Sequence, residues 1–359
     1  MGDDRLPWAG IGAGEQAPLT VGVDVGGTKT HLALSSGEER IVPSAHWHRE
    51  GLDRVAVGIA ELLRETAAAV PVALAVGSHG CNDRQLCTRL ERSLRSNLGD
   101  LPILVVNDAE LLLPSVRASA GVGLISGTGS VAVAYSPDGE MVIAGGWGGY
   151  IGDEGSSTGM FRDAARAVAE AYDRGDPEDD PLVAILCDAL EIDHLRELPR
   201  VLDTFVSPPA WAHLTPGVFL RALEQDSTLI GGVIEQQALG LATLVYCVDH
   251  RGASTDTVVA AGGVVVNAAW FEDALRRALA EVSPGSELVV LREPPVVGAL
   301  NLAADLAVLT SGGEPDRPIG PVLRHLFPIR GSAADDHPSD GVLAGELQAS
   351  PTLEGDGHQ

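Results

Sequence analysis

The chain has 359 residues, 45% of them hydrophobic and 43 of them glycine; this length exceeds one compact core and suits two domains of ordinary size. Its 24 Lys and Arg residues against 50 Asp and Glu residues give a net charge of -26, which repels nucleic acid and anionic lipid surfaces and so excludes both as partners.

No apolar run in the sequence reaches the roughly 18 residues that a membrane span needs, and the acidic start MGDDRLPWAG lacks the pattern of a signal peptide. The four cysteines contain no CxxC pair, so neither a disulfide framework nor a zinc site is indicated. A cytoplasmic protein with reduced thiols and no membrane partner is therefore expected.

The first half of the chain begins with the pattern strand, glycine turn, strand over residues 21–34, VGVDVGGTKTHLAL. Apolar periodicity then predicts two helices and two strands in alternation. These predicted elements are a helix at 53–69, a strand at 72–76, a helix at 84–97 and a strand at 103–106. Strands that alternate with helices predict an α/β fold with a mainly parallel sheet.

The second half repeats the opening pattern from Gly121, with GVGLISGTGSVAVAY. The predicted elements that follow are helices at 158–173, 181–189, 217–224 and 230–249 and a strand at 257–260. The shared layout indicates an internal duplication in which a phosphate-binding turn opens each half. Residues 1–17 and 312–359 are rich in Gly, Pro and Asp and are expected to be mostly disordered.

The first glycine turn has the composition of a phosphate-binding loop. Its backbone can approach an anion closely, its amides and hydroxyls can donate to phosphate oxygens, and the preceding Asp24 can hold Mg²⁺ through water. The candidate ATP-binding residues here are Gly26, Gly27, Thr28, Lys29 and Thr30. The alternative is an ordinary tight hairpin, and the spacing is not that of a Walker loop.

Two further glycine segments are candidate nucleotide contacts. Gly127, Thr128 and Gly129 offer the same donors as the first turn, again with a plain hairpin as the alternative. Gly262 and Gly263 end a predicted strand and leave bare backbone for a purine or ribose, with Asn267 beyond them as a cap or ligand. The alternative there is a strand-to-helix turn that needs glycine for packing.

Asn107 and Asp108 directly follow the predicted strand ILVV. An acid at the carboxyl end of a parallel strand lies where ligands bind in open α/β sheets, so Asp108 can accept a proton from an attacking hydroxyl. The alternative is a helix N-cap for the segment AELLL.

The segment GGWGGYIGDEGSSTG, residues 145–159, combines many glycines with one tryptophan. Asp153 and Glu154 offer carboxylates that can accept hydrogen bonds from neighbouring sugar hydroxyls. A glycine-rich surface loop before a Ser-capped helix is the alternative.

In this order and spacing, the five segments resemble the sugar kinase and actin-type ATPase superfamily. Within it, the chain is similar to the N-acetylglucosamine kinase and BadF/BadG/BcrA/BcrD ATPase family over about residues 20–311, and GGWGGYIGDEGS is the most specific element. The resemblance implies two ribonuclease-H-like lobes with a cleft between them. The first lobe would be residues 18–117 completed by a helix near 297–311, and the second would be residues 118–296.

The resemblance also implies an ATP- and Mg²⁺-dependent phosphotransferase. Asp108 would take the proton of a sugar 6-hydroxyl, while Mg²⁺, Lys29 and loop amides offset charge on the phosphoryl group. Gly262, Gly263 and Asn267 would form the adenosine region. The substrate contacts would be Ser78, His79, Asn107, Asp108, Thr128, Trp147, Gly148, Asp153 and Ser157.

The expected partner is a small amino sugar. D-Glucosamine is the first choice, because its ammonium suits an acidic site and because Ala144 and Ser157 to Gly159 depart from the family's acyl pocket. N-Acetylglucosamine is the alternative. An ATPase activator of a radical dehydratase is disfavoured, since the glycine segments contain no cysteine for an iron-sulfur cluster, and a silent sugar-sensing relative would have lost Asp108. Homodimers are frequent for the fold by analogy.

Overall fold

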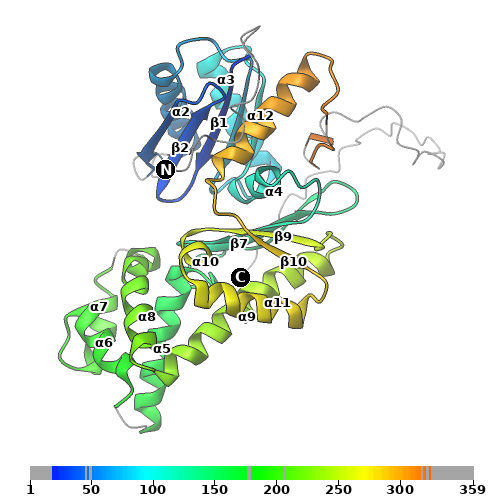
Figure 1. Cartoon of the computed structure of the whole chain (residues 1–359). Helices are drawn as coiled ribbons and strands as arrows, with labels where there is room; N and C mark the ends of the chain where they lie inside the picture. The colour runs from blue at the N-terminus through cyan, green and yellow to red at the C-terminus, as the bar shows by residue number, and fades with distance from the viewer. Residues whose placement is uncertain are drawn as a thin grey trace, which may run out of the picture. The chain divides into compact units, whose positions relative to one another are not determined.

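The computed structural model describes residues 18–44, 47, 51–175, 179–205, 207–316, 318–320 and 323–324. These residues form two five-stranded sheets and the helices that cover them (Figure 1). The predicted disorder of residues 1–17 and of 325–359 lies outside the described residues.

The first sheet has the strand order β3-β2-β1-β4-β5. Its strands are β1 (Thr20–Val25), β2 (Lys29–Leu34), β3 (Glu39–Pro43), β4 (Ala73–Ser78) and β5 (Ile103–Asn107). The sheet is mixed rather than mainly parallel: the pairs β1–β4 and β4–β5 are parallel, whereas β2 pairs antiparallel with both of its neighbours, β1 and β3. Tight turns join β1 to β2 and β2 to β3, and such turns leave no room for the crossover that parallel pairing requires.

The second sheet repeats this topology in the order β10-β9-β6-β7-β8. Its strands are β6 (Val122–Ser126), β7 (Ser130–Tyr135), β8 (Met141–Gly145), β9 (Thr257–Ala261) and β10 (Glu287–Val290). Strand β6 is parallel to β9 and antiparallel to β7, just as β1 is parallel to β4 and antiparallel to β2. The predicted duplication is confirmed at the level of topology, and each glycine turn joins the first two strands of its sheet.

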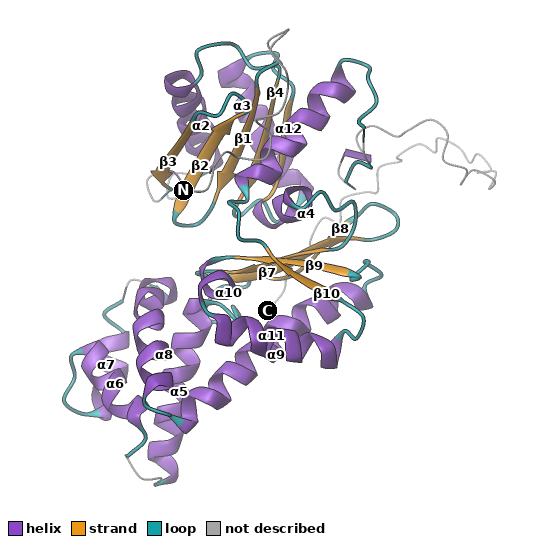
Figure 2. Cartoon of the chain, viewed as in Figure 1, coloured by secondary structure: helices purple, strands orange, loops and turns teal. Residues whose placement is uncertain are grey.

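Helices cover both sheets (Figure 2), and the predicted ones are confirmed within a few residues. The first sheet carries α2 (Leu52–Thr66) and α3 (Arg84–Leu98). Further helices lie on the second sheet or pack against the helices on it. They are α5 (Ser157–Arg174), α6 (Pro181–Leu190), η2 (Leu195–Glu197), α7 (Leu198–Leu202), η3 (Pro208–Leu214), α8 (Thr215–Glu224), α9 (Thr228–His250), α10 (Gly263–Asn267) and α11 (Ala269–Val282). We call each sheet with its covering helices a lobe.

Helix α9 is the central helix of the second lobe. In the part of the chain that the structure describes, it is the one helix whose length and composition would suffice to cross a membrane. Val233, Leu241 and Val248 on it are buried in the core formed with α5, α11 and the second sheet. Packing in the core of the second lobe therefore accounts for the apolar residues of α9.

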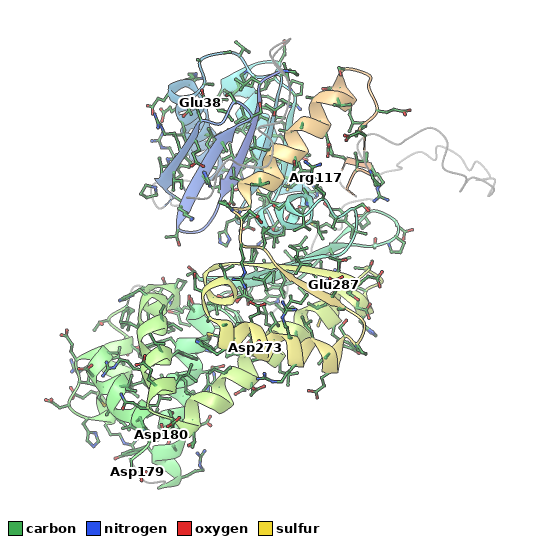
Figure 3. The ribbon with its side chains drawn as sticks, in the orientation of Figure 1. Glu38, Arg117, Asp179, Asp180, Asp273 and Glu287 are labelled. Carbon is green, nitrogen blue, oxygen red and sulfur yellow. The ribbon has the colours of Figure 1, made fainter. Side chains whose placement is uncertain are left out.

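Asp180 connects two helices of the second lobe and is labelled in Figure 3. Its carboxylate accepts the N–H of Leu182 at 2.9 Å, at the start of α6, and the N–H of Thr228 at 3.0 Å, at the start of α9. Donors that both helices leave unsatisfied at their N-termini are paired in this way. Burial opposes ionisation of Asp180, but hydrogen bonds from the Ser227 hydroxyl and the Leu182 N–H outweigh it and lower the pKa of Asp180.

Three short segments connect the lobes: η1 (Asp108–Leu111), α4 (Leu112–Ser115) and α12 (Val296–Thr310). Helix α12 follows the second sheet in sequence but packs on the first, where Leu302 and Leu306 join a buried cluster with Ala75. Ile319 and Leu323, in the segment expected to be mostly disordered, are buried in the same cluster. The chain therefore crosses to the second lobe and returns.

The packing of α12 makes a stability prediction. A Cβ atom at Gly298 would lie 1.9 Å from the carbonyl oxygen of Leu111, so we expect Gly298→Ala to lower the free energy of unfolding by about 2 kcal/mol or more. Gly232→Ala is the matched control, because Gly232 lies within α9 with no atom within 4 Å of its Cβ position and should gain about 0.5–1 kcal/mol. Urea unfolding of both variants measures the difference, and equal midpoints would contradict the tight packing.

Candidate functional site

The first glycine turn presents backbone donors to solvent. The N–H of Gly26 donates to the carbonyl of Lys29 at 3.0 Å and closes the turn. Gly27 and Thr28 at its tip are exposed, and their N–H groups make no backbone hydrogen bond among the described residues. The nearest atom to a Cβ at Gly27 is His79 Cδ2, at 4.0 Å. The tip is therefore open to an anion, as the sequence predicts.

Thr30 and Lys29 differ in their placement. Thr30 is fully buried, and its hydroxyl lies 2.8 Å from that of Ser44. Ser44 also donates its N–H to the carbonyl of Thr28 at 3.0 Å. The Thr30 hydroxyl thus holds the turn through Ser44, while Lys29 is exposed at the start of β2, directly after the turn.

The second glycine turn is anchored to the start of α5. Gly127 donates its N–H to the carbonyl of Gly129 at 3.0 Å, and its own carbonyl accepts the N–H and the hydroxyl of Ser157 at 2.8 and 3.1 Å. The predicted substrate residue Ser157 therefore holds this turn in place. Thr128 is exposed at the tip, where its N–H makes no backbone hydrogen bond among the described residues.

The Gly262-Gly263 corner lies against the second turn. Gly262 has a φ of +112°, and a Cβ there would lie 2.3 Å from the carbonyl oxygen of Ser126. Glycine is required at this position for packing, which is the alternative that the sequence left open, and the same contact brings the corner beside the candidate phosphate turn. Asn267 donates its side-chain amide to the carbonyl of Gly263 at 2.8 Å and is exposed, so it closes the last turn of α10.

Asp153 lies below the second turn. It is 5% exposed, has a φ of +68° and accepts the N–H of Ser130 at 3.2 Å. Burial raises the pKa of Asp153, although this hydrogen bond opposes the shift. The hydroxyl of Ser130 is buried and has no hydrogen-bond partner among the described residues. A buried hydroxyl without a partner is costly, and a phosphate oxygen at this turn would satisfy it.

Asn107, not Asp108, caps the turn η1. The Asn107 side chain accepts the N–H of Ala109 at 3.0 Å, and Glu110 accepts the N–H of Asn107 at 2.7 Å, which completes a capping box. Asn107 is 1% exposed and also donates to the carbonyl of Cys81 at 3.3 Å. The cap predicted as an alternative role for Asp108 is thus provided by its neighbour.

Asp108 is left available for chemistry. Its Oδ2 lies 3.7 Å from Nδ1 of His79, and the Asp108 side chain is 14% exposed. The carboxylate of Asp108 raises the pKa of His79, while burial opposes the shift. The predicted substrate residue Ser78 precedes His79 in the chain. It is fully buried at the end of β4, and its hydroxyl lies 3.4 Å from the carbonyl oxygen of His79.

Asp24 is the second carboxyl group beside Asp108. Burial and the charge of Asp108 raise the pKa of Asp24 to about 7, against a smaller opposing effect of Lys29. Asp153 is close enough across the site for its charge to raise the pKa of His79 as well. The structure therefore brings Asp24, His79, Asp108 and Asp153 together from two lobes.

Trp147 and Gly148 are placed differently from these four residues. The Trp147 side chain is 71% exposed, as are most of Tyr150 and Ile151 after it, at 80% and 77%. Trp147, predicted to form a flat pocket wall, thus lies on an exposed apolar loop, and its contact with a sugar stays a prediction. No atom lies within 4 Å of a Cβ at Gly148.

Two residues that position the glycine-rich segment escaped sequence reasoning. Arg162 on α5 donates to the carbonyls of Gly149 and Gly152 at 3.0 and 2.5 Å. Gln237 on α9 is fully buried and accepts the N–H of Gly155 at 2.7 Å. Neither residue lies in a local sequence motif. The one signal in the sequence was a glutamine, Gln237, on the apolar face of a predicted helix.

ATP and Mg²⁺ fit the residues present. Two open turns supply N–H donors, Ser130 supplies a buried hydroxyl, and Lys29 supplies a positive charge. Among the described residues, no group of three or more His, Cys, Asp or Glu side chains could hold a metal ion. Mg²⁺ commonly binds through one or two carboxylates, waters and substrate phosphates, so Asp24 would hold it together with the phosphates.

The raised pKa of Asp24 predicts how stability depends on pH. The folded protein keeps a proton on Asp24 up to about pH 7, whereas the unfolded chain loses it near pH 4, so this group lowers stability as pH rises between these values. Without metal, Asp24→Asn should therefore melt above wild type at pH 8, and the difference should vanish near pH 4. Mg²⁺ at pH 8 should raise the wild-type midpoint more than that of the variant.

Thermal melts at several pH values, with and without Mg²⁺, measure both effects. Asp138→Asn is the control, because Asp138 is an exposed carboxylate in the β7–β8 turn. A difference between Asp24→Asn and wild type that is independent of pH would contradict the burial of this carboxyl group.

The family model described as the BadF/BadG/BcrA/BcrD ATPase family matches residues 21–303. The chain is 25% identical over 301 residues to the N-acetylmuramic acid/N-acetylglucosamine kinase of Clostridium acetobutylicum, covering 79% of this chain and 97% of that one. It is 26% identical over 316 residues to the N-acetyl-D-glucosamine kinase of Dictyostelium discoideum, with the same coverage of 79% and 97%.

Among solved structures, a proposed N-acetylglucosamine kinase from Chromobacterium violaceum aligns with a TM-score of 0.61 at 23% identity. The alignment covers 80% of this chain and 99% of that one. This likeness shows the fold, and it agrees with the two ribonuclease-H-like lobes that the sequence predicts.

Proposed function

We propose that this chain, which belongs to the BadF/BadG/BcrA/BcrD ATPase family, is an ATP-dependent kinase that phosphorylates the 6-hydroxyl of an amino sugar. The observation that carries the proposal is the placement of Asp108. Asp108 lies at the carboxyl end of β5 and faces His79 and Asp24. Its carboxylate is not needed as the N-cap of η1, because Asn107 provides that cap. The two relatives reported above are named as amino-sugar kinases, which supports the same reaction.

The side chains divide the chemistry between them. Asp108 accepts the proton of the sugar hydroxyl that attacks; its Oδ1 takes the N–H of Ala109 at 3.2 Å, and its Oδ2 faces His79. The two turns, Lys29 and the Ser130 hydroxyl hold the phosphate chain. When bound, ATP supplies the phosphoryl group and Mg²⁺ neutralises charge on it. Asp153 accepts hydrogen bonds from sugar hydroxyls and thereby orients the ring.

N-Acetylglucosamine is the first candidate substrate. Both relatives carry this sugar in their names, and it is neutral. N-Acetylmuramic acid, which the Clostridium name also includes, carries a carboxylate that would meet the negative charges of Asp108 and Asp153 in a partly buried site. The same charges favour an ammonium, so D-glucosamine, the first choice from the sequence alone, becomes the second candidate.

The test is a coupled ADP-release assay with N-acetylglucosamine, glucosamine, N-acetylmuramic acid and glucose. Asp108→Asn should lower kcat/KM by about 10² to 10⁴-fold, the usual contribution of a general base, while Asp138→Asn serves as the exposed control. A higher kcat/KM for glucosamine would reverse the order of the two sugars and leave the reaction unchanged. ATP hydrolysis that no sugar stimulates, and that Asp108→Asn does not alter, would overturn the kinase proposal.

A further inference from the structure

A partly buried charge cluster joins the two lobes next to Asp108. The Glu110 side chain is 4% exposed and pairs with Nη2 of Arg84, from the start of α3, at 2.6 Å. The hydroxyl of Tyr135, from the end of β7, donates to the same carboxylate and accepts from Arg84. Side chains from α3 and from β7 thus meet at the carboxylate of Glu110 in η1.

Glu110 also controls the backbone that carries the proposed base. Its second oxygen accepts the N–H of Asn107 at 2.7 Å, and Asn107 in turn accepts the N–H of Ala109 at 3.0 Å. Asp108 lies between these two bonded residues at the first position of η1. A change at Glu110 therefore acts on Asp108 through hydrogen bonds on both sides of it.

Tyr135 connects this cluster to the second glycine turn. It is the last residue of β7, and β7 begins at Ser130, directly after that turn. Its ring packs against the buried cluster of the first lobe that contains Leu111 and Leu302. Because a strand is a stiff connection, the Tyr135 hydroxyl fixes the distance between the turn and the carboxylate of Glu110.

We propose that Glu110 and Tyr135 are positioning residues that hold the carboxylate of Asp108 in register with the second glycine turn. The inference rests on the proposed function, since it takes Asp108 as the base. A phosphoryl acceptor and donor held by different lobes must meet within a few tenths of an ångström, and small misplacements lower the rate steeply.

The cluster is poorly explained as a device for stability alone. The Glu110 carboxylate is buried, so its desolvation offsets much of its attraction to Arg84. The Arg84 side chain is 38% exposed, and ion pairs that water can reach contribute little to stability. Compared with apolar side chains, the three polar groups add hydrogen bonds of fixed direction, which end at the carboxylate of Glu110. Glu110 lies in the same short turn, η1, as the proposed base Asp108.

The experiment measures kcat and KM for ATP and sugar in Tyr135→Phe, Glu110→Gln and Glu110→Ala. Tyr135→Phe keeps the ring and removes the hydroxyl, so we expect kcat to fall roughly tenfold, the factor for one lost hydrogen bond to a charged group, with both KM values within about twofold of wild type. Glu110→Gln should retain more kcat than Glu110→Ala, because the amide oxygen can still accept one of the bonds.

Tyr246→Phe is the matched control, since Tyr246 is 47% exposed on α9 and stacks on His250. Wild-type kcat in Tyr135→Phe and Glu110→Ala overturns the inference while the proposed function stands. Loss of activity that parallels loss of folded protein in unfolding curves, without a change of kcat per folded molecule, also overturns it. If wild type itself shows no sugar-dependent ADP release, the proposed function fails first and the inference fails with it.

Discussion

The site depends on how closely the turn η1 packs between the two sheets. A Cβ at Gly123 of β6 would lie 2.1 Å from the carbonyl oxygen of Ala109, and one at Gly77 of β4 would lie 2.3 Å from the side chain of Leu111. Bare backbone on both sides lets the turn touch both lobes. Asp108, its first residue, is thereby placed where the first lobe ends and the second begins, and any side chain at these glycines would push the lobes apart.

A second constraint is electrostatic. The chain has a net charge of -26, yet the proposed site still gathers Asp24, Asp108 and Asp153. Burial first, and then the nearby charge of Asp108, raise the pKa of Asp24 to about 7, so that this carboxyl group keeps its proton below that pH. Backbone N–H groups, Lys29 and a divalent cation could offset this charge, so the proposed nucleotide and metal binding would be coupled to the ionisation of the site. The same surroundings disfavour an anionic sugar.

The glycine-rich segment after β8 carries two different environments. Its end is held rigidly: Arg162 and Gln237 bind its backbone, and Asp153 is locked below the second turn in a left-handed conformation. Its beginning, with Trp147, Tyr150 and Ile151, is exposed. Asp153, at the rigid end, is the residue of this segment that we propose to contact the sugar.

The sequence by itself determined the longer helices, the duplication and the two glycine turns, because apolar period and glycine placement are local properties. It did not predict the strands β3, β8 and β10. It also pointed to Asp108, since a polar residue after an apolar strand marks the ligand-binding edge of a sheet. Only the tertiary structure decided which neighbour caps η1, that the Thr30 hydroxyl is buried on Ser44, and that Arg84, Glu110 and Tyr135 meet. The cap is a choice between two adjacent polar residues that both suit the position. The other contacts join residues as far apart as 51 positions in the chain, and a local pattern carries no information about which distant side chain will arrive.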